Sequence, residues 1–180
     1  MNRRKALLQT SVIIGSAVLV PSWLASCKDT AKGGVAYEGD MAEILGEFSD
    51  TLLPTTEDSP GAKAAGNGPA MQTIINDCYT QEEADAIAIL LGDIDQESQN
   101  KFDSRFVELD PTQRIEILSP WDTQKDEWYV KLKELSVYVY FTSKAGMQEA
   151  LRYTEVPGKF DGCFDYKEGD KAWAWCFFSY

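Results

Sequence analysis

Histidine is absent from this 180-residue sequence. Its absence excludes Ser-His-Asp triads, H-E-x-x-H zinc sites and histidine-ligated haem, and it removes the side chain that most often serves as a general base. Carboxylates, lysines, tyrosines and cysteines remain available as catalytic groups. The composition therefore makes an enzymatic function less favoured but does not exclude it.

Basic residues are scarce and unevenly placed. Lysine and arginine number 17 against 29 aspartates and glutamates, which gives a net charge of −12. Arg3, Arg4 and Lys5 supply three of the positive charges, and no acidic residue precedes Cys27. Removal of residues 1–26 would leave 14 basic and 29 acidic residues, a net charge of −15. Such a field repels a phosphate backbone, so nucleic-acid binding is disfavoured.

The apolar run of residues 6–20 is short and diluted by polar residues. About 20 apolar residues are needed to span a bilayer, so this run does not predict a membrane helix. Together with the basic residues before it, it is typical of an export signal. Arg3-Arg4 resembles a twin-arginine signal, although Asn2 and Ala6 depart from the usual pattern. A general secretory signal is the alternative.

A lipid attachment site is indicated directly after this run. Leu24-Ala25-Ser26-Cys27 resembles a bacterial lipobox, in which the cysteine is acylated and becomes the new N-terminus. We expect a signal peptide over residues 1–26, a lipid on Cys27 and a polar tether over residues 27–39. The protein would then be anchored on the periplasmic side of a membrane, with inner or outer membrane left open. An ordinary cysteine in a signal cleaved elsewhere is the alternative.

Motifs for binding a cofactor are also missing. The sequence contains neither C-x-x-C-H, which attaches haem c, nor a dinucleotide fingerprint. Gly61, Gly66 and Gly68 lie close together, but their spacing fits neither G-x-G-x-x-G nor G-x-x-x-x-G-K-[ST]. Any redox chemistry would therefore use a cofactor held by another chain, and no metal is expected here.

The folded part is predicted to begin with a helix and a long loop. Asp40-Met41-Ala42-Glu43 has the pattern of a capping box and opens a helix over residues 41–53. Pro54 cannot continue that helix. Residues 54–69 are rich in Pro, Gly, Thr and Asp, which predicts an irregular loop.

Two further helices are predicted next. One begins near Pro69, a residue favoured in the first turn. Thr80-Gln81-Glu82-Glu83 opens a longer one, which is expected to run on through Phe102 and Phe106. The predicted buried faces are Met71, Ile74, Ile75, Cys78 and Tyr79 in the first, and Ala84, Ile87, Leu90, Leu91 and Ile94 in the second.

The C-terminal half continues the helical pattern and then loses it. Asp110 opens a short helix with Ile115 and Leu118 that Pro120 ends. Residues 123–141 keep helical spacing, although Ser136 to Phe141 has the composition of a strand. Ser143 caps a helix over residues 144–153, and little regular structure follows, with a short hairpin near Trp173. The fold is therefore mainly α, a single small helical domain over residues 40–180 with long irregular loops and an aromatic-rich irregular C-terminal segment.

Aromatic rings and turn residues are concentrated in residues 135–175. Large rigid rings on a backbone set by Gly and Pro are typical of binding surfaces. We interpret this stretch as an interface. The alternative is that the rings fill the protein's own core.

Three blocks in this order resemble one protein family. They are LPTTEDSPGAKAAG at residues 53–66, YFTSKAG at residues 140–146, and a dispersed third block of Tyr153, Val156-Pro157-Gly158, Gly162-Cys163 and Ala172-Trp173. Together they are similar to the gluconate 2-dehydrogenase subunit 3 family, the small subunit of membrane-bound flavin dehydrogenases. Two departures are Tyr138-Val139, where Gly is usual before Tyr-Phe, and Lys144, where Glu is common.

The resemblance implies a non-catalytic subunit that stabilises and co-exports a larger dehydrogenase of the glucose-methanol-choline (GMC) type. That partner would carry FAD and act on a sugar or polyol, and a c-type cytochrome with haem c would often accept the electrons. The residues we expect at the interface are Pro54, Thr55, Thr56, Pro60, Gly61, Tyr140, Phe141, Thr142, Ser143, Val156, Pro157, Gly158, Gly162, Cys163 and Trp173.

The cysteine count is also compatible with a partner subunit. Lipidation of Cys27 leaves Cys78, Cys163 and Cys176, an odd number for an exported protein, which indicates an intermolecular bond or a free thiol. Cys163 lies in the aromatic segment, so we hypothesise a disulfide to the large subunit there. A bridge from Cys163 to Cys176, or three buried thiols, are the alternatives.

Two other functions are compatible with the sequence. Glu57 and Asp58 could serve as an acid and base pair in a stand-alone enzyme, although adjacent acids on a loop are usually a solvated turn. The chain could also be a surface lipoprotein that binds carbohydrate by stacking on Trp173, Trp175 and Tyr166.

Overall fold

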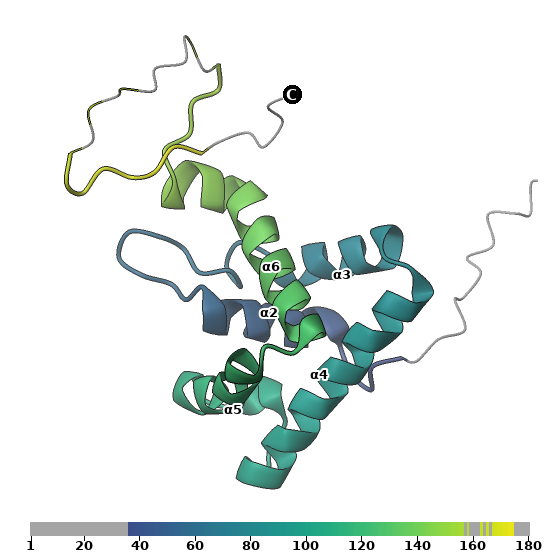
Figure 1. The fold of residues 1–180 in the computed structure, drawn as a ribbon. Coiled ribbons are helices and arrows are strands. Elements are labelled where there is room, and N and C mark those ends of the chain that lie inside the picture. The colour runs from purple at the N-terminus through teal and green to yellow at the C-terminus, as the bar shows by residue number, and fades with distance from the viewer. Residues whose placement is uncertain (1–35, 157, 159–162, 164, 166, 175–180) are drawn as a thin grey trace, which may run out of the picture. The chain divides into compact units, whose positions relative to one another are not determined.

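The computed structural model describes residues 36–156, 158, 163, 165 and 167–174 (Figure 1). Within this part the regular structure is helical, and β-type pairing is limited to two isolated bridges. The predicted mainly α fold, with long irregular loops and an irregular C-terminal segment, is confirmed.

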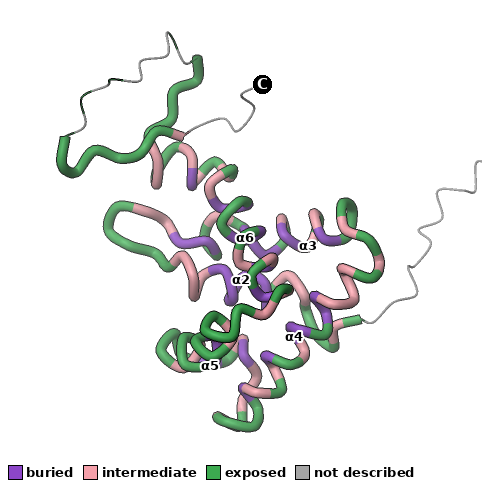
Figure 2. Tube along the Cα trace, in the orientation of Figure 1, coloured by how far each residue is buried: buried purple, intermediate pink, exposed green. Residues whose placement is uncertain are grey.

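The elements are α2 (Met41–Leu52), α3 (Asn67–Cys78), α4 (Gln81–Phe102), the 3-10 turn η2 (Phe106–Glu108), α5 (Pro111–Gln124), α6 (Glu127–Thr142) and the π-helical turn η3 (Gly146–Ala150). Helix α2 is the centre of the packing. It contacts α3, α5 and α6 (Figure 1) as well as η2, and its Ile44, Leu45 and Phe48 have no exposed surface. Figure 2 shows buried residues along α2 and on the helices that face it.

Side-chain caps explain where α2 and α4 begin. The Asp40 carboxylate accepts hydrogen bonds from the amides of Ala42 and Glu43 at 2.9 and 3.3 Å. Thr80 and Glu83 satisfy each other's backbone amides, which completes the predicted capping box. Both predicted helix starts are therefore confirmed.

Helices α2 and α3 cross with their backbones almost in contact. A Cβ atom added to Gly68 would lie 2.1 Å from the carbonyl oxygen of Ala42 and 2.9 Å from the amide nitrogen of Gly46. Asn67 is fully buried beside this crossing, and its side-chain amide donates to the carbonyl of Ser136 in α6 at 3.0 Å. Helix α3 accordingly begins at Asn67, slightly earlier than the predicted start near Pro69.

The prediction that the third helix runs through Phe106 is wrong. Helix α4 ends at Phe102 because Asp103 adopts a left-handed conformation, with φ of 55°, which aspartate tolerates better than most residues. The chain then turns back, and Phe106 enters the core from η2 with no exposed surface. Its amide donates to the carboxylate of Asp95 at 2.8 Å.

Pro120 does not end its helix, contrary to the prediction. Helix α5 continues past it to Gln124. Proline lacks the amide that would bond the carbonyl of Glu116, but both residues are exposed, so that carbonyl can be solvated. Ile117 and Leu118 supply the buried face, whereas Ile115 is 54% exposed.

Residues after α6 are less regular than predicted. Ser143 caps the following turn by accepting a hydrogen bond from the amide of Gly146 at 3.0 Å, but the turn ends at Ala150 rather than Tyr153. A parallel bridge between Arg152 and Trp173 replaces the expected hairpin among the described residues. The helical interpretation of residues 123–141 is confirmed from Glu127 onward, where α6 begins. Its predicted start is wrong, because residues 123–124 end α5 and Lys125 adopts a left-handed conformation that breaks the helix before α6.

The predicted buried face of α3 is wrong at Cys78. Met71 and Ile75 are buried, but the Cys78 thiol is exposed at the end of the helix. Cys163 is also exposed. The alternative of three buried thiols is therefore wrong, while Cys27 and Cys176 lie outside the described residues.

A partly buried ion cluster links the long loop to the core. Glu47 of α2 is only 5% exposed, and its two carboxylate oxygens accept hydrogen bonds from Lys63 of the loop and Arg114 of α5. Arg114 also donates to the carbonyl of Val107 at 2.9 Å, and its guanidinium lies over the ring of Phe106. The Glu47 carboxylate thus joins α2 to the long loop and to α5.

A second polar cluster fixes the segment that enters α2. The Tyr37 hydroxyl donates to the Asp95 carboxylate at 2.9 Å and accepts a hydrogen bond from Arg105 at 2.7 Å. Arg105 also pairs with Asp95 at 2.9 Å, which raises the pKa of that guanidinium. Burial, followed by the hydrogen bond to Asp95, raises the pKa of Tyr37 from 10.0 to about 12. Burial likewise raises the pKa of Tyr129, which packs edge-on against Phe48, to about 12.

We expect the fold to lose stability as the pH rises from 10 to 12. Both phenols have a higher pKa in the folded chain than in the unfolded chain, so their contribution is complete below pH 10 and is lost as the pH rises through 12. The thermal unfolding midpoint measured across this range should fall. A Tyr37→Phe variant should fall less steeply, since only Tyr129 of the pair remains to ionise; an unchanged slope would contradict the role of Tyr37.

Candidate functional site

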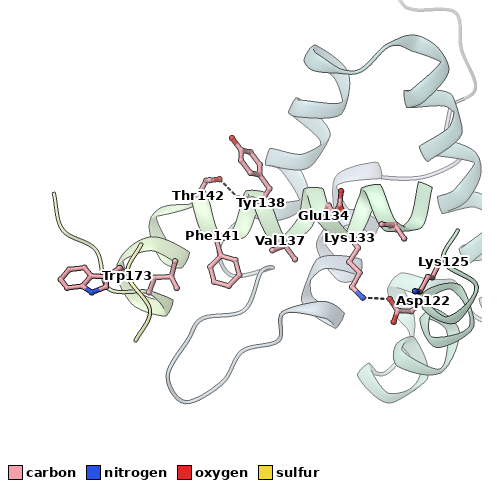
Figure 3. A pocket seen from close by; sticks show the side chains of 11 residues that line it. Asp122, Lys125, Lys133, Glu134, Val137, Tyr138, Phe141, Thr142 and Trp173 are labelled. Carbon is pink, nitrogen blue, oxygen red and sulfur yellow. Dashed lines mark hydrogen bonds and ion pairs between the residues drawn. The ribbon is translucent and has the colours of Figure 1, made fainter. Parts of the chain in front are cut away.

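A groove of about 1130 Å³ runs along α6, between the end of α5 and the C-terminal segment (Figure 3). We call it the α6 groove. It is lined by Asp122, Lys125, Val130, Lys133, Glu134, Val137, Tyr138, Phe141, Thr142, Leu151 and Trp173. Figure 3 shows Val137 and Phe141 on the same side of α6, with Lys133 reaching Asp122 at the α5 end.

The helical register explains why α6 has this second apolar face. Val130, Val137 and Phe141 are seven and four residues apart, which places them on one face. The buried residues Leu132 and Leu135 point instead to the core. A helix that is apolar on both faces is normally covered on both. In the part of the chain that the structure describes, the outer face of α6 stays partly exposed, with Val130 and Val137 each 37% exposed.

Exposure of apolar side chains is concentrated at this groove. The exposed large hydrophobic residues of the described chain are Ile89, Ile115, Val130, Val137, Tyr138, Tyr153, Val156 and Trp173. Four of these, Val130, Val137, Tyr138 and Trp173, line the α6 groove. Scattered exposed hydrophobic residues are normal, whereas four of them beside one groove make it the candidate binding surface of the described chain.

Charge is balanced at the α5 end of the groove. Lys133 pairs with Asp122 at 2.5 Å, and Lys125 and Glu134 complete a lining of two bases and two acids. The whole chain is strongly acidic by contrast. The α6 groove is therefore a neutral, largely apolar surface on an acidic protein.

Trp173 is held firmly at the other end of the groove. The amide of Arg152 donates to the carbonyl of Ala172 at 2.8 Å, and the amide of Ala174 donates to the carbonyl of Arg152 at 2.9 Å. The Arg152 guanidinium lies 4.1 Å from the centre of the indole ring, within the range of a cation–π contact. These contacts fix a ring that remains 43% exposed.

Lys171 joins the C-terminal segment to the rest of this end of the molecule. Its ammonium group donates to the carbonyl of Asp58 in the long loop at 2.8 Å and to the carbonyl of Glu149 in η3. Tyr140 makes a similar connection from α6, since its hydroxyl shares a hydrogen bond with Ser59 at 2.5 Å and donates to the carbonyl of Pro60. The long loop, η3 and the C-terminal segment therefore meet at the end of α6.

The predicted interface residues fall into distinct environments. Eight of them are exposed: Pro54, Thr55, Thr56, Thr142, Val156, Gly158, Cys163 and Trp173. Three are partly buried, namely Pro60, Phe141 and Ser143, and two are buried, namely Gly61 and Tyr140. The other two, Pro157 and Gly162, lie outside the described residues. Phe141, Thr142 and Trp173 line the α6 groove. Tyr140 instead serves the fold, because it is only 2% exposed and bonds the chain's own loop. Contact of any of these residues with a partner stays a prediction.

Several lining residues were not predicted from the sequence. Val130, Val137 and Leu151 lie in the groove, and Lys171 holds its C-terminal wall. The spacing of Val130 and Val137, out of register with Leu132 and Leu135, was the signal that could have identified a second face of α6.

The residues of the two alternative functions do not form a described site. Glu57 and Asp58 are both exposed on the long loop. Tyr166 and Trp175, proposed with Trp173 to bind sugar, lie outside the described residues. Across the part of the chain that the structure describes, no group of three or more Cys, Asp or Glu side chains is arranged to hold a metal ion.

Comparison with known families decides the relationship of this chain. The sequence model of the gluconate 2-dehydrogenase subunit 3 family matches residues 40–158, well over half of the chain. The chain belongs to this family. No curated protein and no solved structure matches it. The predicted family membership is thereby confirmed, and the match includes the first two blocks and the third as far as Gly158.

Two of those blocks have a structural role in this gluconate 2-dehydrogenase subunit 3 protein. Tyr140, in the block at residues 140–146, anchors Ser59 and Pro60 of the block at residues 53–66. A Cβ atom added to Gly146 would lie 2.0 Å from the carbonyl oxygen of Tyr140, so the turn after α6 requires glycine there. None of the described helices is both long and apolar enough to span a membrane.

Proposed function

We propose that this chain is the non-catalytic small subunit of an oxidoreductase complex that stabilises, co-exports and tethers a large FAD-dependent dehydrogenase of the GMC type. Its membership of the gluconate 2-dehydrogenase subunit 3 family supports association with a dehydrogenase complex. The observation that carries the proposal is the match of residues 40–158 to that family. An apolar face of α6, where Val130 and Val137 are exposed near Trp173 of the C-terminal segment, is compatible with it.

A subunit with such a face acts by binding. An apolar surface buried on a partner gains roughly 25 cal/mol per Å² removed from water, before the costs of association are subtracted. A chain that binds only the folded form of its partner stabilises that form by mass action. The large subunit would accordingly fold, or survive export, less well alone.

The chemistry would lie in the partner. FAD would be bound by the large subunit, which would oxidise a sugar or polyol, and haem c in a third subunit would take the electrons where a cytochrome is present. This chain has no haem attachment motif, no dinucleotide fingerprint and no histidine. Its part is to bind and position that partner.

Anchoring would come from the N-terminus. A signal of the twin-arginine type exports folded proteins, which suits a flavoprotein carried across as a complex. Lipid on Cys27 would then hold the complex at the periplasmic side of a membrane through the tether of residues 27–39. Tyr37, near the end of the proposed tether, is bonded to Asp95 and Arg105 of the helical domain.

Cys163 is the proposed site of a disulfide to the large subunit. The thiol lies in the exposed C-terminal segment, where a partner can reach it. Non-reducing electrophoresis of the purified complex should show one band at the combined mass of the two subunits, and a Cys163→Ser variant should abolish it. A band at this subunit's own mass in the wild type would contradict the crosslink.

Carbohydrate binding by the chain alone is the second candidate, and the exposed indole of Trp173 is what favours it. Sugars stack on flat ring faces, but the guanidinium of Arg152 already covers one face of this ring. With that face covered, the largely apolar groove beside the ring suits a protein partner better.

Co-expression tests the proposed function. The dehydrogenase encoded with this chain should be produced with and without it, and its soluble yield, export and substrate oxidation compared. We expect the yield of exported, active enzyme to fall at least about tenfold without the small subunit. Equal yield, export and activity in both cases would contradict the proposal, as would oxidation of a substrate by the small subunit alone.

A further inference from the structure

The α6 groove has the features of a docking surface with a prepared anchor. Trp173 is held by backbone hydrogen bonds on both sides and by the Arg152 guanidinium, yet much of its ring is exposed. Binding a ring that is already fixed loses little conformational entropy. Tryptophan and arginine are also the residues most often found at interface hot spots.

A second copy of this chain is a poor occupant of the groove. Each copy carries a net charge of −12, or −15 once residues 1–26 are removed, so two copies repel each other. The groove itself is balanced, with Asp122 and Glu134 against Lys125 and Lys133. Charge therefore favours a different chain, one whose contact surface is apolar at its centre and neutral to basic at its edge.

The α6 groove would supply the centre of a larger contact. A standard interface buries about 800 Å² on each partner and involves roughly 20–30 residues a side. The residues that line the groove supply a part of this. Lys171 holds the exposed turn at Asp58 and the segment carrying Trp173 at the same end of α6, so these segments are the nearest candidates for the rest of the contact.

We infer that the α6 groove is where the large dehydrogenase subunit docks, with apolar side chains of that subunit inserted beside Val137, Phe141 and Trp173 and with neutral to basic residues around them. This inference rests on the proposed function and adds to it a location and a contact chemistry. Val137 lies midway along the groove wall formed by α6, so a charge placed there would be buried against the partner without an opposite charge.

The test uses full-length chains co-expressed with the large subunit. Val137→Glu should lower the amount of large subunit that co-purifies at least about tenfold, because an unpaired carboxylate would be buried in the contact. Trp173→Ala should have an effect of the same order through loss of the anchor. Ile115→Glu in α5 and Ile89→Glu in α4 are matched controls, because both side chains are exposed outside the groove lining, and they should leave recovery unchanged. Circular dichroism and thermal unfolding of each variant alone should match the wild type, since all four positions are at least partly exposed on the isolated chain.

The possible results separate this inference from the function on which it rests. If the wild-type chain recovers no large subunit, the proposed function fails and the inference fails with it. If recovery is normal for the wild type and equally normal for Val137→Glu, only the inference is overturned. It is also overturned if Ile115→Glu lowers recovery as much as Val137→Glu does, or if Val137→Glu abolishes self-association of this chain and leaves large-subunit recovery intact.

Discussion

Replacing Glu47 by glutamine is expected to lower the free energy of unfolding by about 3–5 kcal/mol. Glu47 is almost completely buried, and its two oxygens are bonded by Lys63 and Arg114. The neutral amide would leave the guanidinium of Arg114, whose side chain is 11% exposed, without an opposite charge. An uncompensated buried charge costs far more than the net contribution of the pair that it replaces.

The effect of this substitution should reach the long loop as well as the core. Lys63 lies in the loop and Arg114 in α5, so both segments lose an ion pair with α2. Since small domains are stable by about 5–15 kcal/mol, a loss of this size removes a large share of the total. Urea unfolding followed by circular dichroism would measure it, and the loop should become more sensitive to proteolysis.

An exposed ion pair in the same protein is the control. Lys101 and Glu116 pair at 2.8 Å, but Glu116 is 57% exposed. Glu116→Gln should cost no more than about 1 kcal/mol, because solvent screens the pair and rehydrates either partner. Equal losses for Glu47→Gln and Glu116→Gln would show that burial of Glu47 does not govern its contribution.

Replacing Gly68 by alanine is expected to cost about 3 kcal/mol, near the upper end of the range for overpacking. The added Cβ atom would lie 2.1 Å from the Ala42 carbonyl oxygen and 2.9 Å from the Gly46 amide nitrogen. Both are backbone atoms of α2, so no side chain can rotate away, and the two helices must separate. Separation would open the core around Ile44 and Met71, which are fully buried at present.

Gly92 provides a matched control for this prediction. It lies inside α4, and a Cβ atom added there would meet nothing within 4 Å. Gly92→Ala should therefore raise stability by about 0.5–1 kcal/mol through the better helix propensity of alanine. Thermal unfolding should shift downward for Gly68→Ala and slightly upward for Gly92→Ala. A neutral Gly68→Ala variant would show that the α2 and α3 backbones do not approach so closely.

Local chemistry was sufficient to predict most of the helix starts and one helix end. Asp40 and Thr80 bond the first free amides of the helices that follow them, and Pro54 cannot extend a helix. The family could also be recognised, because two of its three blocks, at residues 53–66 and 140–146, are contiguous in the chain. Phe141, Thr142 and Trp173 were expected at an interface from such motifs, and they line the α6 groove.

Other features depended on contacts between distant residues. Asp103 adopts a left-handed conformation where the chain turns back after α4, and the same turn brings Phe106 into the core and its amide to Asp95. Pro120 stays within α5 because its side of the helix faces solvent. Helix propensity alone predicts that α4 continues past Asp103 and that α5 ends at Pro120.

The sequence by itself determined the helical class, the acidic charge, the absence of histidine chemistry and the family, because each depends on residue type or on short spacings. Only the tertiary structure decided which aromatic side chains are available to a partner. Tyr140 and Phe141 are neighbours in one motif, yet the first is buried against Ser59 and Pro60 and the second lines the α6 groove. Adjacent helical residues point about 100° apart, so the packing of α6 against the loop assigns one ring to the fold and leaves the other at the surface.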